Sequence, residues 1–273
     1  MPLATPAEIL RNQSSVLAVN VVTLEHAEAF VRASEATGLS LVLQLSENAV
    51  KYHGSLAPLG TAMLAIAAGA QTPIAVHLDH ATNRELVTEA IELGFTSVMF
   101  DGSALPTEQN IEQTRQVVAQ AANHGVWVEA EIGEIGGKDG VHAPGVKTSV
   151  EDAVMFQTQT QVAGLAVAVG SSHAMVQKEA NLDLVRISEI ATAVDVPLVL
   201  HGSSGVPMDQ LVKAAQAGIK KINISTELNK TFTEQIRVSL DQDASLVDPR
   251  KYLTPAKLAL QAQVEHYLKT LCS

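Results

Sequence analysis

Three histidines that lie far apart in the sequence could together hold a metal ion. His80, His173 and His201 each stand at, or just after, the end of a short apolar segment. Three neutral imidazoles that leave one coordination position open are typical of a catalytic Zn²⁺. Each histidine could instead cap or hydrogen-bond a loop, since spacing this long is not a motif by itself. His77 is interpreted as a core histidine rather than as a ligand.

Four carboxylates accompany these histidines. Asp79 directly precedes His80, where it could donate a proton to a metal-bound substrate or accept one from it. Glu129 and Glu131 share one face of an extended segment, and together with Asp101 they could hold a second cation or orient the histidines. The alternative is a polar layer inside the protein that binds water.

Two segments near the end of the chain are rich in glycine, serine and threonine. They are 202–205, Gly-Ser-Ser-Gly, and 223–227, Asn-Ile-Ser-Thr-Glu. Backbone N–H groups in such loops, at the start of a helix, can bind phosphate without basic side chains. A phosphorylated substrate is therefore the leading hypothesis, and ordinary turns and helix caps are the alternative.

The pattern of apolar segments shows which elements position these residues. Short Val-, Ile- and Leu-rich runs, typical of buried parallel strands, alternate with longer segments of helical period. The predicted strands are Leu17–Val22, Ser40–Leu45, Ile74–Asp79, Ser97–Asp101, Trp127–Ile132, Gly164–Gly170, Pro197–His201 and Lys220–Ile224. The predicted helices are His26–Thr37, Leu56–Gly69, Arg84–Leu93, Thr107–His124, Val150–Thr160, Leu182–Val194, Met208–Ala217 and Glu227–Leu240.

This alternation predicts a single α/β domain over residues 1–273, a (β/α)₈ TIM barrel. Extra helices are expected at Pro6–Asn12 and Pro255–Leu271, and a doubly wound open sheet is the alternative fold. A barrel gathers residues that follow its strands at one rim, so it would bring the histidines, carboxylates and glycine-serine segments together. The glycine-rich segment 133–140 after the fifth strand is expected to be a mobile loop.

Composition limits the partners. Lys and Arg number 18 against 29 Asp and Glu, a net charge of −11, and no basic run contains aromatic residues, so nucleic acid is not an expected partner. No leader-like start and no long apolar stretch is present, so we expect a cytoplasmic protein that does not bind membranes. The single cysteine, Cys272, excludes internal disulfides and thiolate metal clusters. Lys220 and Lys221 begin the eighth predicted strand instead of ending it, which disfavours a Schiff base.

Ordered motifs along nearly the whole chain resemble those of the class II, metal-dependent ketose-bisphosphate aldolases. The motifs are Ala18-Val19-Asn20-Val21, Gln44-Leu45-Ser46, His77-Leu78-Asp79-His80, Met99-Phe100-Asp101-Gly102-Ser103, Glu129-Ala130-Glu131-Ile132-Gly133, Gly136-Gly137, Leu200-His201-Gly202-Ser203-Ser204-Gly205, Asn223-Ile224-Ser225-Thr226 and Asp248-Pro249-Arg250-Lys251-Tyr252-Leu253.

The resemblance implies a role for each matching residue. His80, His173 and His201 would hold the catalytic Zn²⁺, and Asp79 would be the acid and base at the C4 oxygen. Asp101 and Glu131 match positions that take a second divalent ion, and some members also bind a monovalent cation. The triose phosphate would lie against Ala174, Gly202, Ser203, Ser204, Asn223, Ile224, Ser225 and Thr226. Members are typically cytoplasmic homodimers or homotetramers.

The implied reaction is reversible cleavage of a ketose 1,6-bisphosphate, with fructose 1,6-bisphosphate as the first candidate. The products would be dihydroxyacetone phosphate, formed through a zinc-stabilised enediolate, and glyceraldehyde 3-phosphate. Tagatose 1,6-bisphosphate or another ketose phosphate, a metal-dependent hydrolase or epimerase, and a non-catalytic accessory subunit are the alternatives.

Two positions depart from the family pattern. Ala174 stands where glycine is usual, so its Cβ could crowd the phosphate or alter the choice of substrate. Lys138-Asp139 stands where paired acids are frequent, so the base that acts at C3 is not assigned; Glu134 and Asp139 are the candidates.

Overall fold

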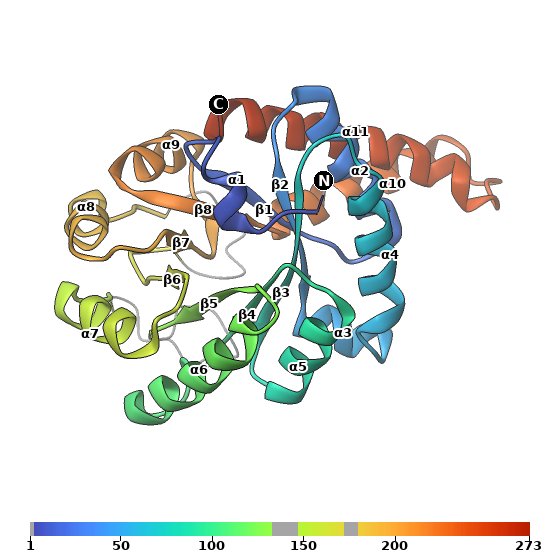
Figure 1. The fold of residues 1–273 in the computed structure, drawn as a ribbon. Coiled ribbons are helices and arrows are strands. Elements are labelled where there is room, and N and C mark those ends of the chain that lie inside the picture. The colour runs from blue at the N-terminus through green and yellow to red at the C-terminus, as the bar shows by residue number, and fades with distance from the viewer. Residues whose placement is uncertain (1–2, 133–146, 172–179) are drawn as a thin grey trace.

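In the computed structural model, which describes residues 3–132, 147–171 and 180–273, eight parallel strands form a closed barrel (Figure 1). Each strand pairs with the next in the sequence, and the last pairs with the first. The strands are β1 Val16–Asn20, β2 Leu41–Ser46, β3 Ile74–Ala81, β4 Ser97–Phe100, β5 Trp127–Glu131, β6 Gly164–Ala166, β7 Leu198–Leu200 and β8 Ile219–Ile224. The predicted TIM barrel is confirmed, and the open sheet is excluded.

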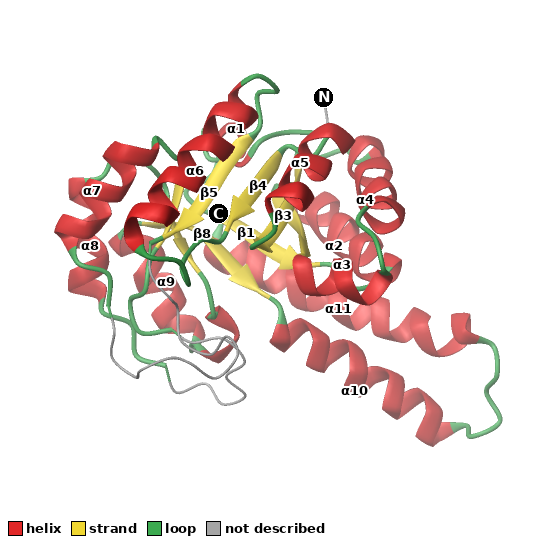
Figure 2. Ribbon diagram, turned by 90° about the horizontal axis from the view of Figure 1, so that it is seen from below, coloured by secondary structure: helices red, strands yellow, loops and turns green. Residues whose placement is uncertain are grey.

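Helices surround the barrel. They are α1 Pro6–Ile9, α2 Leu24–Thr37, α3 Glu47–His53, α4 Ala57–Gly69, α5 Arg84–Leu93, α6 Thr107–Ala122, α7 Val150–Thr160, α8 Leu184–Ala193, α9 Met208–Ala217, α10 Thr226–Gln242 and α11 Pro249–Leu271, with a 3₁₀ turn, η1, at Ser203–Gly205. In Figure 2, α10 and α11 lie side by side and project together beyond the barrel. No helix in the described ranges is both long and apolar enough to cross a membrane.

Three clusters of apolar residues are buried in the described part of the chain. The largest joins outward-facing strand residues such as Leu43 and Val76 to the surrounding helices. A smaller cluster joins Ile9 of α1 to Val16 and Val42 at the start of the barrel. Near the opposite ends of the strands, the buried residues include many polar and charged ones: Gln44, His77, Asp79, Asp101, Glu129, Glu131, His201, Lys221 and Asn223. Such side chains are costly to bury unless they are paired, so they must satisfy one another or a ligand.

Candidate active site

Asp79 and His80 are adjacent in β3, yet both line the same pocket. In a regular strand, neighbouring side chains point to opposite faces. The strand is irregular here, because its register with β4 shifts between Leu78 and Ala81 and His80 has a φ of +50°. Residues other than glycine rarely adopt this left-handed backbone conformation, and it persists where the surrounding structure enforces it. The irregularity lets two consecutive reactive groups share one site.

The pocket lies at the carboxyl ends of the strands and has a volume of about 190 Å³. Its lining comprises Asn20, Ser46, Asn48, Asp79, His80, His201, Gly202, Ser203, Ser204, Asn223, Ser225 and Thr226. Residues from the ends of β1, β2, β3, β7 and β8 therefore converge on one space, although they come from the whole length of the chain.

Most of the residues singled out from the sequence line this pocket, but not all do. Ile224 is buried in the apolar layer outside the strands, so its side chain does not face the pocket. His173, Ala174, Glu134 and Asp139 lie outside the described residues. Asn20, Ser46 and Asn48 line the pocket but were not selected as site residues. The strand-end rule could have found Asn20 and Ser46, because they are the last residues of β1 and β2.

His80 connects two groups of potential metal ligands. Ligand atoms of Asp79, His80 and His201 lie within 4.8 Å of one another, and so do those of His80, Asp101 and Glu131. The Nδ1 atom of His80 is 2.8 Å from Oδ2 of Asp101 and 3.9 Å from Oε2 of Glu131. Imidazole nitrogens and carboxylate oxygens are the donors that zinc and similar divalent ions accept. The donor set thus fits the metal that the sequence suggested.

The two carboxylate oxygens of Asp79 have different surroundings. Asn20 donates from Nδ2 to Oδ2 of Asp79 at 2.8 Å, and Gln44 donates to Oδ1 of Asn20 at 3.2 Å. Oδ1 of Asp79 is buried and has no hydrogen-bond partner within the described part of the chain. Burial raises the pKa of Asp79, but electrostatic interactions with His80, His201 and Lys221 outweigh this and leave the pKa below its ordinary value. The side chain is therefore a carboxylate near neutral pH.

Glu129 and Glu131 lie beside different histidines, although they share one face of β5. Oε1 of Glu129 is 2.7 Å from Nε2 of His201, whereas Glu131 lies near His80. A carboxylate behind an imidazole fixes its orientation and increases its basicity as a ligand. The contact of Glu129 with His201 is suited to this orienting role.

His77 does not line the pocket. It is fully buried, and its Nδ1 is 2.9 Å from Oγ of Ser97. Burial, with a smaller effect of Lys221, lowers the pKa of His77 to about 3. A neutral histidine bound to a neighbouring strand agrees with the core role expected from the sequence.

The loops after β7 and β8 are tied to each other. Oγ of Ser204 accepts hydrogen bonds from the backbone N–H groups of Ser225 and Glu227, each at 3.3 Å. Gly202 adopts a left-handed φ of 68° as the chain turns from β7 into η1. The pocket therefore has a wall of hydroxyl groups and backbone around the start of α10, a 17-residue helix whose N-terminus favours anions.

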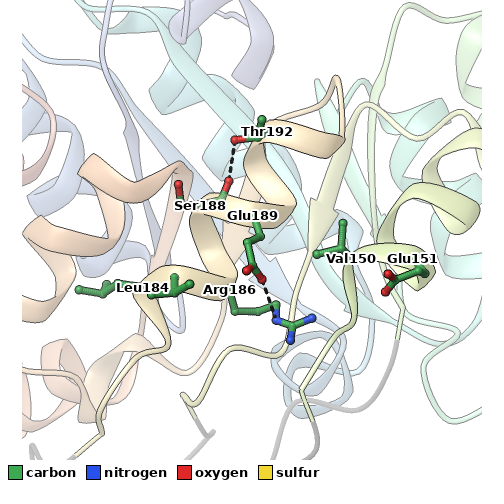
Figure 3. A pocket seen from close by; sticks show the side chains of 8 residues that line it. Val150, Glu151, Leu184, Arg186, Ser188, Glu189 and Thr192 are labelled. Atoms are coloured by element: carbon green, nitrogen blue, oxygen red, sulfur yellow. Dashed lines mark hydrogen bonds and ion pairs between the residues drawn. The ribbon is translucent and has the colours of Figure 1, made fainter.

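A second hollow lies on the outside of the barrel, between the start of α7 and one side of α8 (Figure 3). It is lined by Val150, Glu151, Leu184, Val185, Arg186, Ser188, Glu189 and Thr192, and its Arg186 and Glu189 form an ion pair at 3.5 Å. Neither group of potential metal ligands contributes to it. The potential metal ligands lie at the carboxyl ends of the strands instead.

Comparisons with known proteins agree with the geometry. A family model described as fructose-bisphosphate aldolase class-II matches residues 6–273. The 6-phospho-5-dehydro-2-deoxy-D-gluconate aldolase of Bacillus subtilis is 34% identical over 95% of this chain and 90% of its own length. The fructose-bisphosphate aldolase of Staphylococcus aureus is 35% identical over 98% of this chain and 97% of its own. A crystal structure of a putative fructose-1,6-bisphosphate aldolase from Coccidioides immitis has a TM-score of 0.86 at 29% identity, covering 97% of this chain and 94% of the other.

Proposed function

Because the chain belongs to the class II fructose-bisphosphate aldolase family, and is a lyase of the aldolase type, we propose that it cleaves a phosphorylated ketose reversibly with a bound Zn²⁺. The observation that carries this proposal is the convergence of Asp79, His80 and His201 within 4.8 Å in a pocket whose other wall suits phosphate. Fructose 1,6-bisphosphate is the first candidate substrate.

His80 and His201, together with His173 by resemblance, would hold the catalytic ion, and Asp101 and Glu131 would serve a second one. A divalent ion bound there supplies a Lewis acid that polarises the substrate carbonyl. Asp79 accepts the C4 hydroxyl proton at Oδ1 as the bond between C3 and C4 breaks, and returns it in the condensation direction. Asn20 keeps Asp79 in place by its hydrogen bond to Oδ2.

The phosphate of the three-carbon product would lie between the loops after β7 and β8. Backbone N–H groups of 202–204 and of Thr226, at the start of α10, would bind it, with the side-chain amide of Asn223 nearby. Neither lysine nor arginine occurs among the described lining residues, so this wall would bind the anion through dipoles. A homodimer or homotetramer in the cytoplasm is part of the same proposal.

The candidate substrates differ in the half that is released as an aldehyde. Relatives at 34% and 35% identity are named for two different phosphorylated sugars, so identity alone does not choose between them. Both are candidates here, alongside tagatose 1,6-bisphosphate. An aldolase of this kind would release dihydroxyacetone phosphate from each of them, which allows one assay to compare all three.

The test is a coupled assay for dihydroxyacetone phosphate with fructose 1,6-bisphosphate, tagatose 1,6-bisphosphate and 6-phospho-5-dehydro-2-deoxygluconate. We expect cleavage of at least one sugar, loss of cleavage after chelation, and recovery when Zn²⁺ is added. Cleavage that persists in the chelated protein would contradict the metal-dependent mechanism. Zinc-loaded protein that cleaves none of the three would contradict the proposed substrate class.

A further inference from the structure

A lysine side chain is completely buried inside the barrel beneath the pocket. Lys221 is the third residue of β8; its side chain is 0% exposed, and it does not line the pocket. Its Nζ lies 2.8 Å from Oε2 of Glu129 on β5 and 3.0 Å from Oδ1 of Asn223. A buried ammonium is costly unless it is paired and hydrogen-bonded, so these two contacts account for its place in the fold.

The contact with Glu129 determines which nitrogen of His201 carries the proton. Lys221 holds one carboxylate oxygen of Glu129, and the other lies 2.7 Å from Nε2 of His201. An ionised carboxylate can only accept hydrogen bonds, so Nε2 must carry the proton when the imidazole is neutral. The lone pair is then on Nδ1.

The contact with Asn223 determines the orientation of the amide. Because Lys221 can only donate, the atom of Asn223 that faces it must be the oxygen. The amide nitrogen Nδ2 is therefore turned toward His201 and donates to Nδ1 at 3.1 Å, and Asn223 lines the pocket. One buried cation thus orients a group in each of two strands, β5 and β8.

We propose that Lys221 is a positioning residue that keeps the lone pair of His201 on Nδ1, where the metal would replace the hydrogen bond from Asn223, and that the amide N–H released in this way would bind the substrate anion. The metal and the anion rest on the proposed function, whereas the proton position and the amide orientation do not. The ion pair also explains why a lysine in the barrel of an aldolase need not be a nucleophile: its nitrogen is paired with Glu129 and lies outside the pocket lining.

The decisive variant is the double replacement Lys221→Met with Glu129→Gln. It removes both charges together, whereas Lys221→Met alone would leave a buried carboxylate unpaired and could fail to fold. Lys220→Met is the matched control, because Lys220 is the neighbouring residue of β8 and its Nζ binds the backbone of Ser14 at the surface. Folding of each variant is checked by circular dichroism and thermal unfolding.

The readout is the ¹⁵N NMR spectrum of histidine-labelled, metal-free protein, with the His201 signals assigned from a His201→Gln variant. We expect a single tautomer protonated at Nε2 in the parent protein and in Lys220→Met, and a mixture of both tautomers in the double variant, since a glutamine can either donate or accept. A folded double variant that keeps a single Nε2-protonated His201 would overturn the proposal. No substrate or metal is present, so the result does not depend on the proposed function.

Zinc affinity, measured by competition with a chromophoric chelator, gives the functional consequence. Loss of an outer contact to a ligating histidine typically weakens metal binding about 10- to 100-fold. We expect a decrease of this size for the double variant and none for Lys220→Met. Equal zinc affinity in the parent and the double variant would overturn the role of Lys221 in presenting Nδ1.

Discussion

In the proposed reaction, Asp79 is the base of the pocket. Asn20 donates to one of its carboxylate oxygens, and Oδ1 would face the substrate. Electrostatic interactions with neighbouring histidines and Lys221 keep the pKa of Asp79 below its ordinary value, although burial raises it. The side chain can therefore accept a proton at neutral pH without a preceding deprotonation of its own.

Replacement of this carboxylate by an amide of similar size tests whether Asp79 acts as a base. Asp79→Asn keeps a carbonyl oxygen for the hydrogen bond from Asn20 but removes the base. We expect turnover to fall about 10²- to 10⁴-fold, the usual contribution of a general base, with zinc content unchanged in elemental analysis. Asp209→Asn, at an exposed position of α9, should retain parent activity. Parent turnover in Asp79→Asn would remove Asp79 from this role.

His26 gives a prediction about pH and stability. It is buried at the start of α2 against Phe232, with ring centres 4.5 Å apart, and burial lowers its pKa to about 4. As pH falls below the ordinary pKa of 6.5, the unfolded chain takes up a proton at His26 but the folded protein does not. The stabilisation is thus complete above pH 6.5 and is lost as pH falls toward about 4.

Between pH 7 and pH 5, this difference is worth about 2 kcal/mol of unfolding free energy. Urea unfolding of His26→Leu should therefore show a pH dependence that is weaker by about that amount than in the parent protein. His266→Leu, at an exposed histidine of α11, should keep the parent pH dependence. An identical dependence in the parent and His26→Leu would show that His26 does not titrate as its burial indicates.

The sequence alone predicted that Asp79, His80 and His201 lie close together, because residues that follow the strands of a barrel meet at one rim. It was not sufficient to show how adjacent Asp79 and His80 both reach the pocket. The left-handed conformation of His80 and the shifted register of β3 depend on contacts with β4, not on a local turn signal. The pairing of Glu129 with Lys221 was also not predicted, since two residues 0% exposed on separate strands meet only in the closed barrel.

Among the strands and helices, β5 and β6 show how closely the elements pack. The Cβ of an alanine at Gly164 in β6 would lie 2.2 Å from the Trp127 ring of β5. Trp127 is buried, so its ring has little room to move. Glycine is therefore needed here for the close approach of two strands.

Gly164→Ala should destabilise the protein by about 1–3 kcal/mol through overpacking, as measured by urea unfolding. Gly69→Ala is the matched control: an added Cβ at the end of α4 meets no atom within 4 Å. There, the loss of glycine flexibility in the unfolded chain should give a stabilisation of about 0.4–1 kcal/mol. Equal unfolding free energies for the two variants would contradict the packing around Trp127.

Element types were predicted better than element ends. All eight strands were found because parallel strands covered on both sides read as continuous apolar runs. The helix α3 was missed, since Glu47–His53 is short and its start at Ser46 is also the last residue of a strand. The start of α11 was placed at Pro255, whereas the helix begins at Pro249 behind the cap Asp248, and Pro255 lies inside it. An Asp-Pro pair is a helix-start signal, which would have placed the start of this helix at Pro249.

At the scale of the whole molecule, the net charge of −11 must be reconciled with an anionic substrate. The described lining of the pocket offers hydroxyl groups, amides, backbone N–H groups and the start of α10 for a phosphate, and neither lysine nor arginine. A divalent ion bound by either group of potential ligands would add positive charge there. We therefore expect the metal to lie in this pocket, where it would offset the charge of the substrate.

Diffraction from zinc-loaded crystals at wavelengths on both sides of the zinc absorption edge tests this most directly. We expect the strongest zinc-specific anomalous peak in the pocket, bonded to a ring nitrogen of His80 and to Nδ1 of His201. A strongest peak at another histidine, or an active zinc-loaded enzyme with no peak in this pocket, would contradict it.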